Sequence, residues 1–239
     1  MAVTGIQQTA EFIARFRSFD AAMQNERFEQ FCADFKRLQT GLAPLQAQAA
    51  AEQRRTAGTF NIFRLLGVAH DEVRTHSALL ANLLDPHGSH AQGTLFLERF
   101  LICCNKMFPE LPAPSIPITA GRWTVRTEFM TPQGILDIVL SSSRLSHLYV
   151  IENKVWAMEQ TDQLTRYDGW LKQQSQYAHR ALFYLTPDGR PSLTSGDAPY
   201  YRLSYRAHIV PWLEETLAEV EAPHVVETLK QYLKVINDL

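Results

Sequence analysis

Three charged residues lie in or at the end of apolar segments that are typical of β-strands. Asp137 interrupts one such segment, and Glu152 and Lys154 end another. Side chains alternate between the two faces of a strand, so Glu152 and Lys154 share one face and Asn153 points away. A carboxylate on a central strand is costly to bury unless it is paired or binds a metal ion. These residues are therefore candidates for a functional centre.

Two carboxylates on neighbouring strands suit phosphodiester hydrolysis. They repel each other, and a divalent cation such as Mg²⁺, which prefers carboxylate and carbonyl oxygens, would remove that repulsion. Such a cation can neutralise the scissile phosphate and activate a bound water, and Lys154 can orient that water or stabilise the developing charge. The spacing alone leaves open a second interpretation, in which Glu152 and Lys154 form a buried structural pair that balances Asp137.

The same residues carry a resemblance to a known family. Asp137, followed 15 positions later by Glu152-Asn153-Lys154, resembles the signature of the PD-(D/E)XK nuclease superfamily, with Leu136 in place of the usual proline. Further along, Gln163 and Tyr167 resemble the QxxxY motif of the RecB-like branch. Residues four apart lie on one face of a helix, so both side chains are expected to point toward the active site.

A stretch before the strands is similar to a prokaryotic subfamily of these nucleases. It includes residues 61–63, 71–77 and 83–90, and the resemblance extends over about residues 60–206. In that subfamily a helix acid contributes to the metal site, and the matching position here is Glu72. A second interpretation of Glu72 is an acid that interacts favourably with the N-terminus of its helix.

The resemblance implies a metal-dependent nuclease with DNA as the expected substrate and a bacterial or phage setting, in genome defence or restriction. It implies that Asp137, Glu152 and the backbone carbonyl of Asn153 bind Mg²⁺ or Mn²⁺, with Glu72 completing the ligand set directly or through water. Lys154 would act on the nucleophile and the developing charge. Gln163 and Tyr167 would position Lys154 or the DNA backbone.

Several histidines suggest other chemistry. His70-Asp71 is reminiscent of an HD-type phosphohydrolase, but no supporting ligands accompany it. His76, His87 and His90 could suggest zinc, although histidines at a helix end and turn commonly form hydrogen bonds instead. His90 is also a candidate auxiliary group near the metal cluster.

Three further side chains have both a structural and a functional interpretation. Arg166 could contact phosphate, but a solvated surface arginine is the favoured expectation. Trp156 and Trp170 could stack on bases, whereas packing in the core is the favoured expectation for both.

The order of helical and strand-like patterns around these residues predicts an α/β fold. We expect a restriction-endonuclease-like core at residues 58–206, with a helix, three strands, a helix and a strand, and helical additions at 1–57 and 207–239. Expected strands are Trp123–Met130, Ile135–Ser141, Leu148–Lys154, Ala181–Leu185 and, less distinctly, Tyr201–Tyr205; the helix between the third and fourth covers about Glu159–Gln174.

The N-terminal addition has a regular pattern of apolar residues. They recur at steps of three to five and form one stripe: Phe12, Phe16, Phe19, Met23, Phe28, Phe31, Phe35 and Leu38. A second helix, roughly 42–56, is expected to start near Pro44 and to stop at Gly58, forming a hairpin packed on the core. An arm that binds a partner or a second copy is the alternative.

Composition excludes several classes of protein. The 239 residues are 46% hydrophobic and 20% charged with a net charge of −2, which is ordinary for a globular protein and unlike a basic nucleic-acid-binding protein. No apolar run is long enough to span a membrane, and no secretory signal is evident, so a cytoplasmic location is expected. Cys32, Cys103 and Cys104 have no metal-binding spacing and are expected to be reduced.

Two competing functions remain at this point. One is an effector domain that becomes active when a partner oligomerises it, which the aromatic N-terminal helix and the acidic C-terminal segment favour. The other is a catalytically silent module that binds nucleic acid, which the intact Asp137, Glu152 and Lys154 disfavour. No glycine-rich phosphate loop is present, so ATP hydrolysis is not expected.

Overall fold

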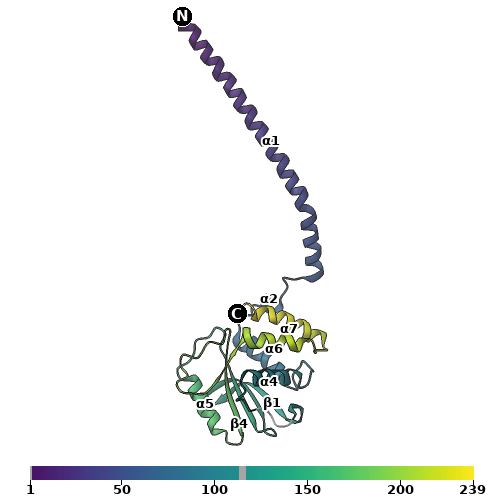
Figure 1. Cartoon of the computed structure of the whole chain (residues 1–239), viewed down its shortest axis with the longest axis vertical. Helices are drawn as coiled ribbons and strands as arrows, with labels where there is room; N and C mark the ends of the chain where they lie inside the picture. The colour runs from purple at the N-terminus through teal and green to yellow at the C-terminus, as the bar shows by residue number, and fades with distance from the viewer. Residues whose placement is uncertain (1, 113–116) are drawn as a thin grey trace. The chain divides into compact units, whose positions relative to one another are not determined.

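The computed structural model describes residues 2–112 and 117–239 (Figure 1). The chain divides into two compact units at the Phe60–Asn61 boundary. The second unit contains the sheet and the helices on both of its faces, including those near the C-terminus. None of the described helices is both long and apolar enough to cross a membrane.

The first unit consists mainly of one helix, α1 (Ala2–Thr56), which contains Pro44 (Figure 1). The prediction of two helices forming a hairpin was therefore wrong. Proline removes one backbone hydrogen bond, but the flanking Ala, Gln and Leu residues are strong helix formers and the helix continues through it. The helix ends just before Gly58, as expected.

A five-stranded sheet organises the second unit, in the order β1-β2-β3-β4-β5. Strands β1, β2 and β3 pair antiparallel, whereas β3, β4 and β5 pair parallel. The strands are β1 (Trp123–Thr131), β2 (Gly134–Ser142), β3 (His147–Asn153), β4 (His179–Thr186) and β5 (Tyr201–Ser204). All five expected strands are present, with ends shifted by at most two residues.

Helices cover both faces of this sheet (Figure 1). Helix α5 (Gln163–Gln173) packs on one face through Leu164, Trp170 and Leu171 against strand residues that include Val150. The other face is covered by α3 (Ala78–Leu84), α4 (Leu95–Met107), α6 (Val210–Leu217) and α7 (Pro223–Ile236), whose apolar side chains form the larger core. The C-terminal helices thus share a core with the sheet.

The segment before α3 is less regular than its apolar spacing suggests. A short helix, α2 (Ile62–Leu65), is followed by Gly67, whose φ of +70° breaks the helix. The chain becomes helical again in a π-helical turn, η1 (Glu72–Ser77), that leads directly into α3. The remaining short turns are η2 (Ile118–Ala120) and η3 (Tyr205–Ile209). The expected α/β, restriction-endonuclease-like fold with helical additions is confirmed.

Candidate active site

Asp137 lies where β2 and β3 stop pairing. The last backbone pair between these strands joins Ile138 and Ile151, and beyond it the Asn153 N–H donates to Oδ2 of Asp137 at 2.8 Å. A side-chain carboxylate thus takes the place of a β2 backbone acceptor, which brings Asp137 beside the end of β3. Burial raises the pKa of Asp137, although Lys154 and this hydrogen bond act against the shift.

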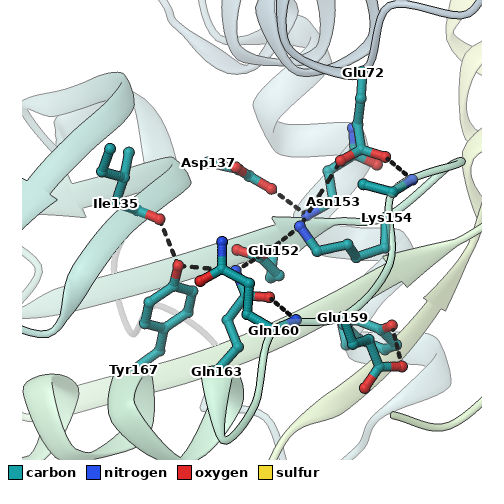
Figure 2. A network of polar contacts seen from close by, with 12 residues as sticks. Glu72, Ile135, Asp137, Glu152, Asn153, Lys154, Glu159, Gln160, Gln163 and Tyr167 are labelled. Carbon is teal, nitrogen blue, oxygen red and sulfur yellow. Dashed lines mark hydrogen bonds and ion pairs between the residues drawn. The ribbon is translucent and has the colours of Figure 1, made fainter. Parts of the chain in front are cut away.

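Glu152 is fully buried beside Asp137 (Figure 2). Its Oε1 accepts from Lys154 Nζ at 2.6 Å and from Gln163 Nε2 at 2.7 Å. Its Oε2 is also buried and has no hydrogen-bond partner. Burial and the neighbouring Asp137 raise the pKa of Glu152 to about 8, with the attraction of Lys154 opposing them. The carboxylate therefore lacks a counter-charge on one side.

Lys154 lies between two acids. Its Nζ is 2.6 Å from Oε1 of Glu152 and 3.8 Å from Oε1 of Glu72, and its side chain is only 8% exposed. Burial acts to lower the pKa of Lys154, but the carboxylates of Glu152, Asp137 and Glu72 outweigh it and the pKa is raised. The lysine is therefore a fixed positive charge at the end of β3.

Glu72 reaches the same place from the first turn of η1. Its Oε2 accepts backbone N–H groups from Val155 at 2.6 Å, Trp156 at 3.1 Å and Ala157 at 3.3 Å. Three successive N–H groups that face one carboxylate form an anion-binding nest. Glu72 thus anchors the loop after β3 and contacts Lys154, and its role as a metal ligand stays a prediction.

Gln163 and Tyr167 lie on the face of α5 that meets the sheet (Figure 2). Gln163 donates from Nε2 to Glu152 and also contacts the Tyr167 hydroxyl at 3.0 Å. That hydroxyl donates to the Ile135 carbonyl at 2.5 Å. The helix therefore holds Glu152 from one side and the start of β2 from the other, and the identification of these residues as a QxxxY motif stays a prediction.

The donor set fits a hard divalent cation better than a soft one. Carboxylates of Asp137 and Glu152 meet here, and the unpartnered Oε2 of Glu152 is free to act as a ligand. The Asn153 N–H faces Asp137, and in an extended strand the carbonyl of a residue lies on the same side as its N–H. Within residues 2–112 and 117–239, no three His, Cys, Asp or Glu side chains lie close enough together to hold a metal ion by themselves. Two carboxylates, a carbonyl and water are thus the set that the chain offers.

The histidines singled out for zinc have other partners. His76 is buried, with Nδ1 at 3.0 Å from the Tyr232 hydroxyl and Nε2 at 3.1 Å from the Ala69 carbonyl. His90 uses Nε2 on the Asp85 carbonyl, and its Nδ1 accepts an N–H from its own turn. Both rings therefore have local hydrogen-bonding roles. Among the described residues, His87 belongs to no group of three side chains that could hold zinc.

The structure shows different surroundings for Arg166, Trp170 and Trp156. Arg166 donates to the Gln133 carbonyl at 2.6 Å and to Gln160 Oε1 at 3.1 Å, so it ties the β1–β2 turn to the loop before α5 rather than extending into solvent. Trp170 is buried, as expected. The expectation of core packing was wrong for Trp156, which is 57% exposed and whose backbone N–H donates to Glu72.

Two groups near the site have no sequence motif. The Asn153 side chain donates to Ser77 Oγ at 3.0 Å and accepts from the Tyr205 hydroxyl at 3.0 Å, all within the buried core. Glu159 accepts hydrogen bonds from Tyr184 and from residues 192–194, which fixes the loop after β4. For the Asn153 side chain, the one signal in the sequence is the alternation along the strand, which turns it away from Lys154 and toward the core.

Comparison with known proteins agrees with this geometry. A family model described as the PD-(D/E)XK nuclease superfamily matches residues 60–234, a range that contains all five strands and every residue of the cluster. No curated protein and no solved structure matches the chain significantly. Because the family match covers well over half of its length, the chain belongs to the PD-(D/E)XK nuclease superfamily.

Proposed function

We propose that the protein is a metal-dependent nuclease whose active site is the cluster at the end of β2 and β3. The observation that carries this proposal is the buried Oε2 of Glu152, which lacks a partner although it lies beside a second acid. A purely structural Glu152–Lys154 pair does not need a second acid beside it, because one carboxylate already balances the lysine. A divalent cation would give the two carboxylates a common partner.

Each residue then has a distinct task. Asp137, Glu152 and the Asn153 carbonyl would hold Mg²⁺ or Mn²⁺, which supplies charge neutralisation at the phosphate and activates water. Lys154 would orient the attacking water and stabilise the charge that develops on the phosphate. Glu72 fixes the loop that carries Lys154 and would reach the cation directly or through water. Gln163 would keep Glu152 in place.

Tyr167 would position other residues of the site, and the substrate and biological role complete the proposal. Tyr167 holds Gln163 and the start of β2, and through them the two acids. DNA is the substrate that we favour over RNA, and a role in bacterial or phage genome defence follows from the resemblance to the prokaryotic subfamily. These two parts of the proposal rest on analogy within the superfamily.

One panel of reactions tests this function. Purified protein is incubated with closed circular DNA, linear DNA and RNA, each with Mg²⁺, Mn²⁺ or EDTA. We expect cleavage of DNA with either metal and none with EDTA, and loss of closed circles would establish endonuclease action. Cleavage in EDTA would contradict the metal requirement, and intact substrates in every reaction would favour a catalytically silent module.

A second candidate is a nuclease that becomes active on oligomerisation through α1. The specific observation is a stripe of exposed side chains whose spacing alternates between three and four: Phe28, Phe31, Phe35, Leu38, Leu42 and Leu45. This is the apolar spacing of a coiled coil. A nuclease activity that rises more steeply than protein concentration would favour this candidate over an independent enzyme.

A further inference from the structure

Trp156 is an exposed aromatic residue two positions after Lys154. Its side chain is 57% exposed, although tryptophan has more apolar surface to bury than any other residue. Single exposed apolar residues are common on proteins. This one differs because the backbone N–H groups before and after it, those of Val155 and Ala157, also bind Glu72 of the charged cluster.

The backbone that carries the indole is fixed by the cluster itself. The Trp156 N–H donates to Oε2 of Glu72 at 3.1 Å, and the preceding N–H of Val155 donates to the same oxygen at 2.6 Å. The other oxygen of Glu72 lies 3.8 Å from Lys154 Nζ. One carboxylate therefore contacts both the lysine ammonium group and the backbone that carries the indole.

A hollow of about 240 Å³ opens beside this indole. The rings of His70 and Trp156 form part of its wall and meet edge to face, with centroids 5.6 Å apart at 76°. Arg64 and Asp238, which form an ion pair, also line it. The hollow thus combines aromatic surface with a hydrogen-bond donor and an acceptor, both of which are more than half exposed.

The chemistry of this wall favours a nucleobase over an apolar side chain. Aromatic side chains stack on bases of any sequence, and arginine and aspartate are groups that read the edges of bases. Trp156 follows Lys154 by two positions, and both contact Glu72, so a base on this wall would belong to a nucleotide near a phosphodiester at Lys154. A peptide side chain would need neither the ion pair nor the nearby phosphate site.

We propose that Trp156 and His70 form a stacking site for an unpaired nucleobase next to the scissile phosphodiester. The inference rests on the proposed nuclease function and specifies that the base held beside the cleaved bond is unpaired, as in a single strand or a locally unpaired stretch of circular DNA. Bases inside an intact duplex are stacked on each other and reach such a site only after they are flipped out.

Binding in EDTA tests this site separately from cleavage. The probes are a fluorescein-labelled dT15 strand, a fully abasic strand of the same length and a matched duplex, and fluorescence anisotropy gives the dissociation constants. Trp156→Ala is expected to weaken binding of dT15 between about 5-fold and about 100-fold. Trp156→Phe should recover part of the loss. His70→Ala should weaken binding less, because its ring supports the indole.

The matched control is Met158→Ala. Met158 is 88% exposed in the same loop but has no ring, so its replacement should leave dT15 binding unchanged. Trp156→Ala should also leave binding of the abasic strand and of the duplex unchanged. Circular dichroism checks that the variants are folded.

Three results would overturn the stacking site: no binding of dT15 by the wild type, equal binding by wild type and Trp156→Ala, or an equal loss on the abasic strand. Failure of the proposed function is a different result, namely no cleavage of any substrate by the wild type with Mg²⁺ or Mn²⁺. A base-dependent loss in Trp156→Ala supports the stacking site whether or not cleavage is observed.

Discussion

Glu152 is the residue whose surroundings differ most from those of an ordinary carboxylate. It is fully buried, has one oxygen without a partner and lies against a second acid, so the pKa of Glu152 is raised to about 8. Lys154 is the only positive charge that the cluster itself provides. The chemistry proposed for this site therefore depends on how these two side chains respond to replacement and to pH.

Lys154→Ala is expected to lower the cleavage rate by about 100-fold or more, because an electrostatic group at a developing charge is often worth about 3 kcal/mol. Binding of Mn²⁺ should survive, since an ammonium group is no ligand. Lys154→Arg should not restore full activity, because the guanidinium is larger and planar. Steady-state kinetics and calorimetry measure the two effects. Lys172→Ala, which removes an exposed lysine, is the control; a normal rate in Lys154→Ala would leave this residue with only a structural role.

The affinity for Mn²⁺ is expected to rise with pH between about pH 6 and about pH 8. Burial and Asp137 raise the pKa of Glu152 from 4.5 to about 8, so the metal-free protein holds a proton there that a cation must displace. By the same shift, the metal-free protein loses stability as the pH rises from about 4.5 to about 8, because the folded state holds a proton that the unfolded state has released. Calorimetry in two buffers with different ionisation enthalpies measures the released proton. An affinity that is constant over this range would show that Glu152 is not protonated before metal binding.

At the scale of elements, the site forms because β2 and β3 separate at Asp137 and because η1 and α5 approach from two sides. Helix α5 contributes Gln163 and Tyr167, and η1 contributes Glu72. The loop after β3 has no regular structure of its own. Its conformation depends on the Glu72 carboxylate, so this contact can be tested directly.

Glu72→Ala is expected to free the backbone of Val155, Trp156 and Ala157 and to lower the free energy of unfolding by about 1–3 kcal/mol. Glu72→Gln keeps an oxygen acceptor, so it should retain the loop while losing the attraction to Lys154. Hydrogen exchange of the three amides and chemical denaturation distinguish the two variants. If both variants keep slow exchange and full stability, Glu72 does not anchor this loop.

The strands were predicted well from the sequence, for a physical reason. Alternation along a strand is local, so the ends of β2 and β3 and the shared face of Glu152 and Lys154 follow from neighbouring residues alone. The expected hairpin in the first unit was wrong because Pro44 is only one weak position among strong helix formers. Glu159 could not be predicted, since its partners at 184 and 192–194 become neighbours only in the fold.

At the scale of the whole molecule, α1 exposes an apolar stripe, whereas a typical surface helix turns such a stripe toward the core. Its apolar side chains, from Phe28 to Leu45, are between 44% and 67% exposed. A 55-residue helix whose apolar face stays in solvent lacks the stabilisation that packing of that face would provide. Pairing with a second helix of the same pattern would cover that face.

The double substitution Phe35→Glu/Leu38→Glu is therefore expected to convert an oligomer into a monomer, because charges at two core positions of a coiled coil oppose association. Light scattering after size exclusion gives the molar mass over a range of concentrations. Lys36→Glu adds a similar charge beside the stripe and should leave the mass unchanged. A wild-type protein that is monomeric at every concentration would contradict self-association through α1.

The active site is tested most directly by cleavage of closed circular DNA by the wild type, Asp137→Ala and Glu152→Ala, measured with Mn²⁺ and with EDTA. Asp197→Ala, which removes an exposed carboxylate, is the control. We predict cleavage by the wild type and Asp197→Ala with Mn²⁺ only, and none by Asp137→Ala or Glu152→Ala, although both remain folded because loss of one acid relieves repulsion. Wild-type rates in folded Asp137→Ala or Glu152→Ala would contradict the assignment of the active site.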